Sequence, residues 1–177
     1  MNSATNPQRK TGMTMLIIAW SLLFFLLAAA FNGWLDSNTN PNQNPETIQS
    51  GNVREVILEA NRQHHFVVNG SMNGQPVTFL LDTGATDVAI PMQLGMRLGL
   101  PKGPATTVNT ANGLATAYTT LLEEVTIGAI TLRRVRASLN PGLQDDVVLL
   151  GMSALKQLEF SQHGTQLILR QYLSTTP

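Results

Sequence analysis

The strongest restriction on the fold of this chain is a run of 19 residues, 13–31, that contains no charged side chain. As an α-helix with a rise of about 1.5 Å per residue, such a run spans about 28 Å, which matches the hydrocarbon core of a bilayer. The run therefore predicts a single transmembrane helix at residues 13–31.

A cleaved signal peptide is the alternative, because the Ala run at residues 28–30 offers small side chains to a signal peptidase. The apolar run is longer than the usual core of a signal peptide, which favours a retained anchor. Arg9 and Lys10 precede the run, and the first charge after it is Asp36. The positive-inside rule then predicts a cytoplasmic leader at residues 1–12, with the rest of the chain outside.

The charge and composition of the remaining chain exclude several classes of function. Residues 32–177 carry nine basic and eleven acidic side chains, a net charge of −2, which gives no electrostatic footprint for nucleic acid. The absence of cysteine excludes disulfides and thiolate zinc sites. His64 and His65 would point to opposite faces of a strand, and only His163 could join them, so we expect no metal and no cofactor.

Residues 32–52 are rich in Asn, Gln, Ser, Thr and Pro and have little to bury, so they predict a flexible linker. A chain of 177 residues leaves room for one ordinary domain after that linker. We expect the domain at residues 53–170 and a C-terminal tail at residues 171–177.

Short alternating or apolar runs separated by turn residues predict that this domain is built of strands. Hairpin turns are expected at Asn73-Gly74, at Asn112-Gly113 and around Gly128. Pro91 and Gly99 are typical of the two ends of a short helix, and residues 152–158 predict a second one. The expected strands are residues 56–60, 65–69, 75–81, 86–90, 106–111, 114–125, 125–127, 131–139, 147–150 and 166–170.

One carboxylate stands out because the chain delivers it from an apolar run onto a glycine turn. Residues 77–81 are too apolar for a surface strand, so we expect cover on both faces and a partly dry site for Asp82. An unpaired carboxylate there would be costly. Gly84 tolerates positive φ and close backbone approach, and Thr83 adds a hydroxyl that can donate or accept. The alternative is an ordinary turn in which the Asp side chain binds its own backbone two residues on.

The residues around this turn resemble the retroviral-type (retropepsin-like) clan AA aspartic proteases, and in particular a bacterial membrane-anchored branch. The resemblance spans about residues 53–170 and implies an all-β, retropepsin-like acid-protease half-barrel with one or two short helices. It rests on Leu-Leu-Asp-Thr-Gly-Ala at residues 80–85, on residues 86–89 and 147–151, and on residues 67–74, 110–113 and 150–153.

The resemblance also implies roles for individual residues and a place in the cell. Asp82 would be the catalytic residue, and Thr83, Gly84 and Ala85 would support the active site. The domain would face the periplasm of a bacterium, held in the inner membrane by a single span, and would act on a peptide or protein. The hairpin that would close on the substrate as a flap, or else be an ordinary surface hairpin, consists of Thr110, Ala111, Asn112 and Gly113.

Hydrolysis of an amide by activated water needs both a base and an acid, which two carboxylates sharing one proton provide. This chain has one Asp-Thr-Gly, and about 125 folded residues cannot build two lobes of this kind. The second carboxylate is therefore expected from Asp82 of another copy, in a homodimer with a two-fold axis at the site.

These observations predict a membrane-anchored aspartic endopeptidase that activates water between paired Asp82 carboxylates. The alternative is a non-catalytic peptide-binding or assembly module on the same fold, because a fold does not fix a function. A third hypothesis is a structural envelope protein, which would leave the position of Asp82 on a glycine turn unexplained.

Overall fold

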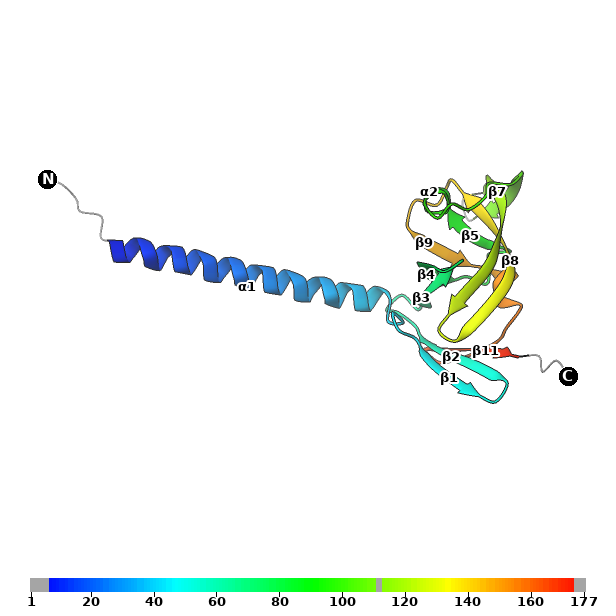
Figure 1. The fold of residues 1–177 in the computed structure, drawn as a ribbon, viewed down its shortest axis with the longest axis horizontal. Helices are drawn as coiled ribbons and strands as arrows, with labels where there is room; N and C mark the ends of the chain where they lie inside the picture. Colours follow the sequence, from blue (N-terminus) through cyan, green and yellow to red (C-terminus); the bar gives the residue numbers. More distant parts are fainter. Residues whose placement is uncertain (1–6, 111–112, 174–177) are drawn as a thin grey trace. The chain divides into compact units, whose positions relative to one another are not determined.

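The computed structural model describes residues 7–110 and 113–173. They form two compact units that divide after Asn38, and each is described by itself. The first unit is α1, Pro7–Thr39, whose last residue already belongs to the second unit (Figure 1). Within α1, Gly12–Phe31 is long and apolar enough to cross a membrane, and none of it is buried in the protein. A membrane span and a signal sequence both fit such a helix near the N-terminus.

The second unit is a β domain, which confirms the predicted all-β class for this part of the chain. Its described residues form two sheets and two short helices. The elements are β1 Glu46–Ser50, β2 Val53–Glu59, β3 Val67–Met72, β4 Gln75–Leu81, β5 Val88–Pro91, α2 Met92–Arg97, β6 Ala105–Thr110, β7 Gly113–Ile127, β8 Ile130–Asn140, β9 Val147–Leu150, α3 Met152–Leu155, β10 Glu159–His163 and β11 Gln166–Tyr172.

The larger sheet has the order β3-β4-β9-β5-β8-β7-β6, and a further pairing of β3 with β7 joins its two halves. The chain threads β9 between β4 and β5: Leu80 pairs with Leu149 in the parallel sense, and Ala89 pairs with Leu149 in the antiparallel sense. Two segments more than 60 residues apart in sequence therefore meet at the C-terminal end of β4, where the Asp82 turn begins.

The smaller sheet is antiparallel, with the order β1-β2-β11-β10. Strands β2 and β11 pair along their whole length, from Val53 opposite Tyr172 to Glu59 opposite Gln166. β10 pairs with β11 and lies at one end of the sheet, and β1 lies at the other.

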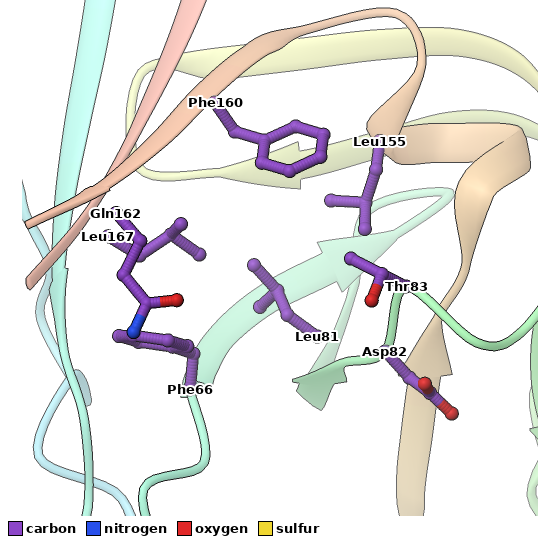
Figure 2. Close-up of a pocket in the computed structure, with 8 residues that line it drawn as sticks. All are labelled: Phe66, Leu81, Asp82, Thr83, Leu155, Phe160, Gln162 and Leu167. Carbon is purple, nitrogen blue, oxygen red and sulfur yellow. The ribbon is translucent and has the colours of Figure 1, made fainter.

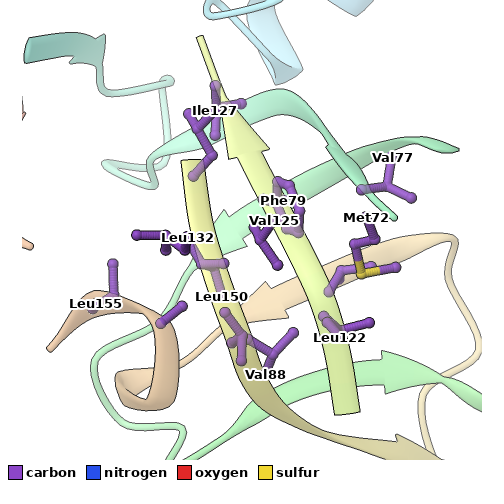
Figure 3. Close-up of a cluster of buried hydrophobic side chains, with 14 of the residues drawn as sticks. Met72, Val77, Phe79, Val88, Leu122, Val125, Ile127, Leu132, Leu150 and Leu155 are labelled. Carbon is purple, nitrogen blue, oxygen red and sulfur yellow. The ribbon is translucent and has the colours of Figure 1, made fainter. Parts of the chain in front are cut away.

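The core lies on the inner faces of these strands, where alternate side chains point inward (Figure 3). Fully buried Phe79, Leu122, Ile127, Leu132 and Leu150 come from four strands of the larger sheet. The expectation that residues 77–81 are covered on both faces is wrong for a single chain. Leu80 of β4 and its neighbours Val147 and Leu149 of β9 share one face, and all three remain partly exposed.

The predicted linker at residues 32–52 is also wrong, because this segment has regular structure. α1 continues to Thr39, and β1 forms a hairpin with β2. Between them, Asn42 is only 4% exposed. Its side-chain amide donates to the carbonyls of Glu59 (2.9 Å) and Val67 (2.7 Å), and its oxygen accepts the Glu59 N–H at 2.7 Å. The Asn42 side chain thus makes the hydrogen bonds to the backbone of Glu59 and Val67 that a neighbouring strand would otherwise make.

Other expectations shift by a few residues. Pro91 caps α2 instead of occupying its first turn, and α3 is a single turn, shorter than the predicted 152–158. Strand β10 was not predicted. His64 and His65 lie in a turn before β3, with His64 at a φ of 61°. Among the described residues, no three His, Asp or Glu side chains gather where they could hold a metal ion.

Replacing Asn42 with Ala should lower the free energy of unfolding by about 3 kcal/mol, because it removes three hydrogen bonds to the backbone, one of them buried and two partly buried. Urea denaturation of the domain measures this loss. Asn44→Ala is the matched control: Asn44 is exposed two residues away, and its replacement should change stability by less than about 0.5 kcal/mol. Equal effects of the two substitutions would contradict the role assigned to Asn42.

Candidate active site

Asp82 follows directly on β4, and its backbone N–H donates to the Leu150 carbonyl of β9 at 3.2 Å. The carboxylate oxygen Oδ1 accepts the Gly84 N–H at 2.8 Å, and the Ala85 N–H donates to the Asp82 carbonyl at 3.3 Å. The turn therefore holds one carboxylate oxygen in place. The second oxygen, Oδ2, accepts no hydrogen bond from the part of the chain that the structure describes, and the side chain is half-buried.

Positive φ plays no part at Gly84. A Cβ at Gly84 would lie 3.1 Å from Asp82 Oδ1, so a larger residue would require that oxygen to shift by a few tenths of an ångström. Of the two expected reasons for this glycine, positive φ is therefore wrong, and close approach fits the structure. Thr83 and Gly84 are both exposed in the single chain.

The start of α3 clamps the far side of the turn. The Met152 N–H donates to the Ala85 carbonyl at 2.8 Å, and the Ser153 N–H donates to the Thr86 carbonyl at 2.9 Å. Gly151 makes this approach possible: a Cβ there would lie 2.7 Å from the Ala85 carbonyl oxygen and would also collide with that of Asp87. Gly151 thus lets the turn and the end of β9 pack backbone to backbone.

Ser153 fixes the next stretch of the turn from inside the protein. Its hydroxyl accepts the Val88 N–H at 3.1 Å and donates to the Arg136 carbonyl at 2.7 Å, and the residue is 3% exposed. Sequence reasoning did not single out Ser153, although it belongs to the Leu-Gly-Met-Ser stretch at residues 150–153. A small polar residue at the start of a helix gave no sign of which distant backbone groups it would satisfy.

Two arginines of β8 form ion pairs on the exposed side of the strand. Arg136 pairs with Asp87 at 3.1 Å, and Arg133 pairs with Glu124 at 3.1 Å. Arg134 has a φ of 52° at a point where the register between β7 and β8 skips one residue on each strand. The two pairs are largely exposed, so each contributes at most about 1 kcal/mol. The Arg136 pair nevertheless engages the carboxylate that lies next to the turn in sequence.

A pocket of about 310 Å³ opens beside Asp82 and Thr83 (Figure 2). Its walls come from the start of β3, the end of β4, α3 and the smaller sheet, and they are mostly apolar. Sequence reasoning missed every wall residue apart from Asp82 and Thr83, since they lie on five segments that only the fold brings together. The remaining lining residues are Phe66, Leu81, Leu155, Phe160, Gln162 and Leu167.

The predicted flap lies at the β6–β7 hairpin. Thr110 pairs with Gly113 across its tip and donates its hydroxyl to the Gly113 carbonyl at 2.8 Å, and Gly113 has a φ of 100°. Ala111 and Asn112, which belong to the predicted flap, lie outside the described residues. Leu114, the next residue of the hairpin, is 79% exposed. Cover of the substrate by Thr110, Ala111, Asn112 and Gly113 stays a prediction.

Known proteins share this arrangement of fold and sequence. Residues 68–157, just over half of the chain, match the family model described as gag-polyprotein putative aspartyl protease. A crystal structure of a retropepsin-like aspartic protease from Rickettsia conorii is similar, with a TM-score of 0.60 and 32% identity over 72% of this chain and 96% of that one.

Two curated relatives are described as uncharacterized proteins. One, from Sinorhizobium sp., lies in the cobV 5′ region and is 36% identical over 63% of this chain and 49% of its own length. The other, RP867 of Rickettsia prowazekii, is 29% identical over 72% of this chain and 56% of its own length. The chain thus spans about half the length of the curated relatives it matches. The matched family model and the shared fold place the chain in the gag-polyprotein aspartyl protease family, as a retropepsin-like member.

Proposed function

We propose that the protein is an aspartic endopeptidase that acts as a homodimer and hydrolyses peptide bonds with water activated between two Asp82 carboxylates. The observation that carries this proposal is the state of that carboxylate. The Gly84 N–H holds Oδ1 at 2.8 Å, Oδ2 accepts nothing from the described residues, and an apolar pocket opens beside it. A fixed carboxylate with one open oxygen next to a peptide-sized hollow fits the chemistry of the family.

The reaction needs a second carboxyl group about 3 Å away, so that one proton is shared between two groups. The described residues of this chain supply no such group. Asp87 pairs with Arg136, and Asp146 pairs with Arg97 at 2.7 Å. A second copy related by a two-fold axis supplies Asp82 again, and that axis would run past the exposed Thr83 and Gly84.

In this dimer the charged Asp82 takes a proton from water while the water oxygen bonds to the peptide carbonyl carbon. The protonated Asp82 of the other copy donates its proton to the carbonyl oxygen. When the C–N bond breaks, the protonated carboxyl gives its proton to the leaving amine, and the charged one takes a proton from a hydroxyl of the tetrahedral intermediate, so that the pair again holds one proton. Thr83 would brace the pair by hydrogen bonds near the axis, and Gly84 and Ala85 would keep the turn in place through their backbone N–H groups.

We also propose that α1 anchors the enzyme as a single span in a bacterial inner membrane, with the domain in the periplasm and a peptide or protein as substrate. The length and apolar composition of Gly12–Phe31 support a membrane span. Arg9 and Lys10 precede this segment, which supports the orientation.

Replacing Asp82 with Asn should lower the rate of peptide cleavage at least about a thousandfold, because the amide can neither accept the water proton nor share one. The fold should persist, since the Asn oxygen can still accept the Gly84 N–H. Cleavage of a peptide library between acidic and neutral pH measures the loss. Asp145→Asn removes an exposed carboxylate outside the pocket and should leave the rate unchanged. Full activity in Asp82→Asn would contradict the role assigned to Asp82, whereas a wild-type chain that cleaves no peptide would favour the non-catalytic peptide-binding module.

The membrane proposal predicts where a reporter fused after residue 177 is active. Alkaline phosphatase, which folds only in the periplasm, should be active in this fusion, and the fusion should remain in the membrane fraction. Moving Arg9 and Lys10 to the other end of the apolar run should reduce the phosphatase signal, since these residues set the orientation. A soluble product that begins near residue 31 would instead establish a cleaved signal peptide.

A further inference from the structure

Buried asparagines fasten the chain to the β domain directly where α1 ends. Asn40, Asn42 and Asn61, which we call the asparagine clamp, are each at most 8% exposed. The side-chain amide of Asn61 donates to the carbonyl of Thr39, the last residue of α1, at 3.1 Å. The side-chain amide of Asn40 donates to the side-chain oxygen of Asn69 in β3 at 2.8 Å. The β domain therefore holds the chain from residue 39 onward.

Asn42 extends this attachment along β3. Its carbonyl accepts the Asn69 N–H at 3.2 Å, and its side-chain amide donates to the Val67 carbonyl at 2.7 Å. Its own N–H donates to the side-chain oxygen of Asn40 at 2.9 Å. Buried amides whose hydrogen bonds are satisfied are costly to pull away from their partners. The clamp thus leaves no slack between residues 39 and 42.

The connection between the apolar segment and the clamp is short. The apolar segment ends at Phe31, and α1 continues without a break to Thr39. These eight residue steps rise about 12 Å as a helix. The same steps, fully extended, would reach at most about 28 Å. The second figure depends on chain length alone, so it holds at any angle between α1 and the β domain.

Asp82 lies a short way from the clamp along the sheet. The Asn42 amide bonds to Val67, and Val67 pairs with Leu80 in the neighbouring strand. Leu80 precedes Asp82 by two residues. One contact between a side chain and a backbone carbonyl, one strand spacing and two strand residues place Asp82 within about 20 Å of Asn42.

These steps limit the height of the candidate active site above the membrane. With α1 helical, Asp82 lies within about 40 Å of the end of the apolar segment. With the connection fully extended, the limit becomes about 60 Å. A flexible linker over residues 32–52 would set a much looser limit, because its extended chain alone would reach about 70 Å.

A limit on height selects among substrates that are themselves fixed in the membrane. Enzyme and substrate are then confined to one bilayer, which raises their effective concentration. Only a peptide bond at a matching height can enter the active site. A freely diffusing protein can present any of its bonds at any height, so a short clamped connection would select nothing in it. The connection therefore favours an anchored substrate.

We propose that the substrate of this site is the membrane-proximal segment of another membrane-anchored protein, on the same side of the bilayer as the β domain. The bond that is cut lies within about 40 Å of the hydrocarbon core. This substrate class rests on the proposed function, both on the peptidase activity of Asp82 and on α1 as a retained anchor.

A series of anchored reporters tests the height limit. The full-length chain and a single-span reporter protein are reconstituted in the same proteoliposomes. Each reporter carries a peptide that the library screen has shown to be cleaved, at the end of an (EAAAK)-type helix that continues from its transmembrane helix. At about 1.5 Å per residue, four helix lengths place the peptide about 15, 30, 70 and 100 Å above the bilayer. Cleavage, measured above an Asp82→Asn background, should be at least tenfold faster at the two lower heights.

An insertion variant shows whether the connection sets this limit. Forty Gly and Ser residues are inserted after Ser37, between the apolar segment and the clamp, so that the clamp stays intact. Such a linker adds an r.m.s. reach of about 35 Å. Cleavage at about 70 Å should then rise at least fivefold over that of the wild-type chain, because the domain can reach this height. The same forty residues added after residue 177 are the matched control and should leave the height profile unchanged.

Equal cleavage at all four heights, or a profile that the insertion after Ser37 does not change, would overturn the inference. Cleavage of the same peptide in a soluble carrier protein, at equal total concentration and as fast as in the lower reporters, would also overturn it and favour a soluble substrate.

A failure here is distinguishable from failure of the proposed function. Cleavage of the free peptide together with height-independent cleavage of the reporters would refute the substrate class and leave the peptidase standing. A chain that cleaves neither the free peptide nor any reporter would refute the peptidase, and the substrate class with it.

Discussion

The candidate active site depends on the hydrogen bond between the Gly84 N–H and Asp82 Oδ1. This bond turns the carboxylate of an otherwise ordinary Asx-type turn into a fixed group with one oxygen left open. Contacts from neighbouring segments hold the turn. The start of α3 binds the Ala85 and Thr86 carbonyls, and Gly151 lets β9 approach them without a side chain between. The hypothesis of an ordinary turn and the hypothesis of a catalytic Asp-Thr-Gly therefore predict the same geometry for a single chain. They differ in whether a second carboxylate lies next to the open oxygen of Asp82.

The sequence was sufficient to predict the β domain, the Asp82 turn and most strands, because these depend on local periodicity and on turn residues such as Asn73-Gly74 and Gly128. It was insufficient where long-range contacts decide. Asn42 looked like part of a polar linker, since nothing in the local sequence shows that its amide would satisfy Glu59 and Val67. Four of the five residues of β10 are polar, and its only large apolar side chain is Phe160. It becomes a strand by pairing with β11.

The exposed features of the single chain gather around Asp82. Thr83 and Gly84 are exposed, one side of β4 and β9 is only partly covered, and Phe160 opens onto the pocket. Cover of these groups by a second copy is what the proposed function predicts. The segment that follows α1 is a separate point. Residues 40–42 are hydrogen-bonded to the β domain, so the described part of the chain has no long flexible tether there.

Subunit mixing tests whether two chains share one active site. A fixed amount of wild-type chain is incubated with increasing amounts of the inactive Asp82→Asn chain, and exchange of subunits is verified by co-purification of differently tagged copies. If the site is shared, cleavage should fall towards zero as mixed dimers replace wild-type dimers, because each mixed site has lost one carboxylate. Cleavage that stays constant while exchange is complete would show that each chain carries its own active site and would refute the shared site.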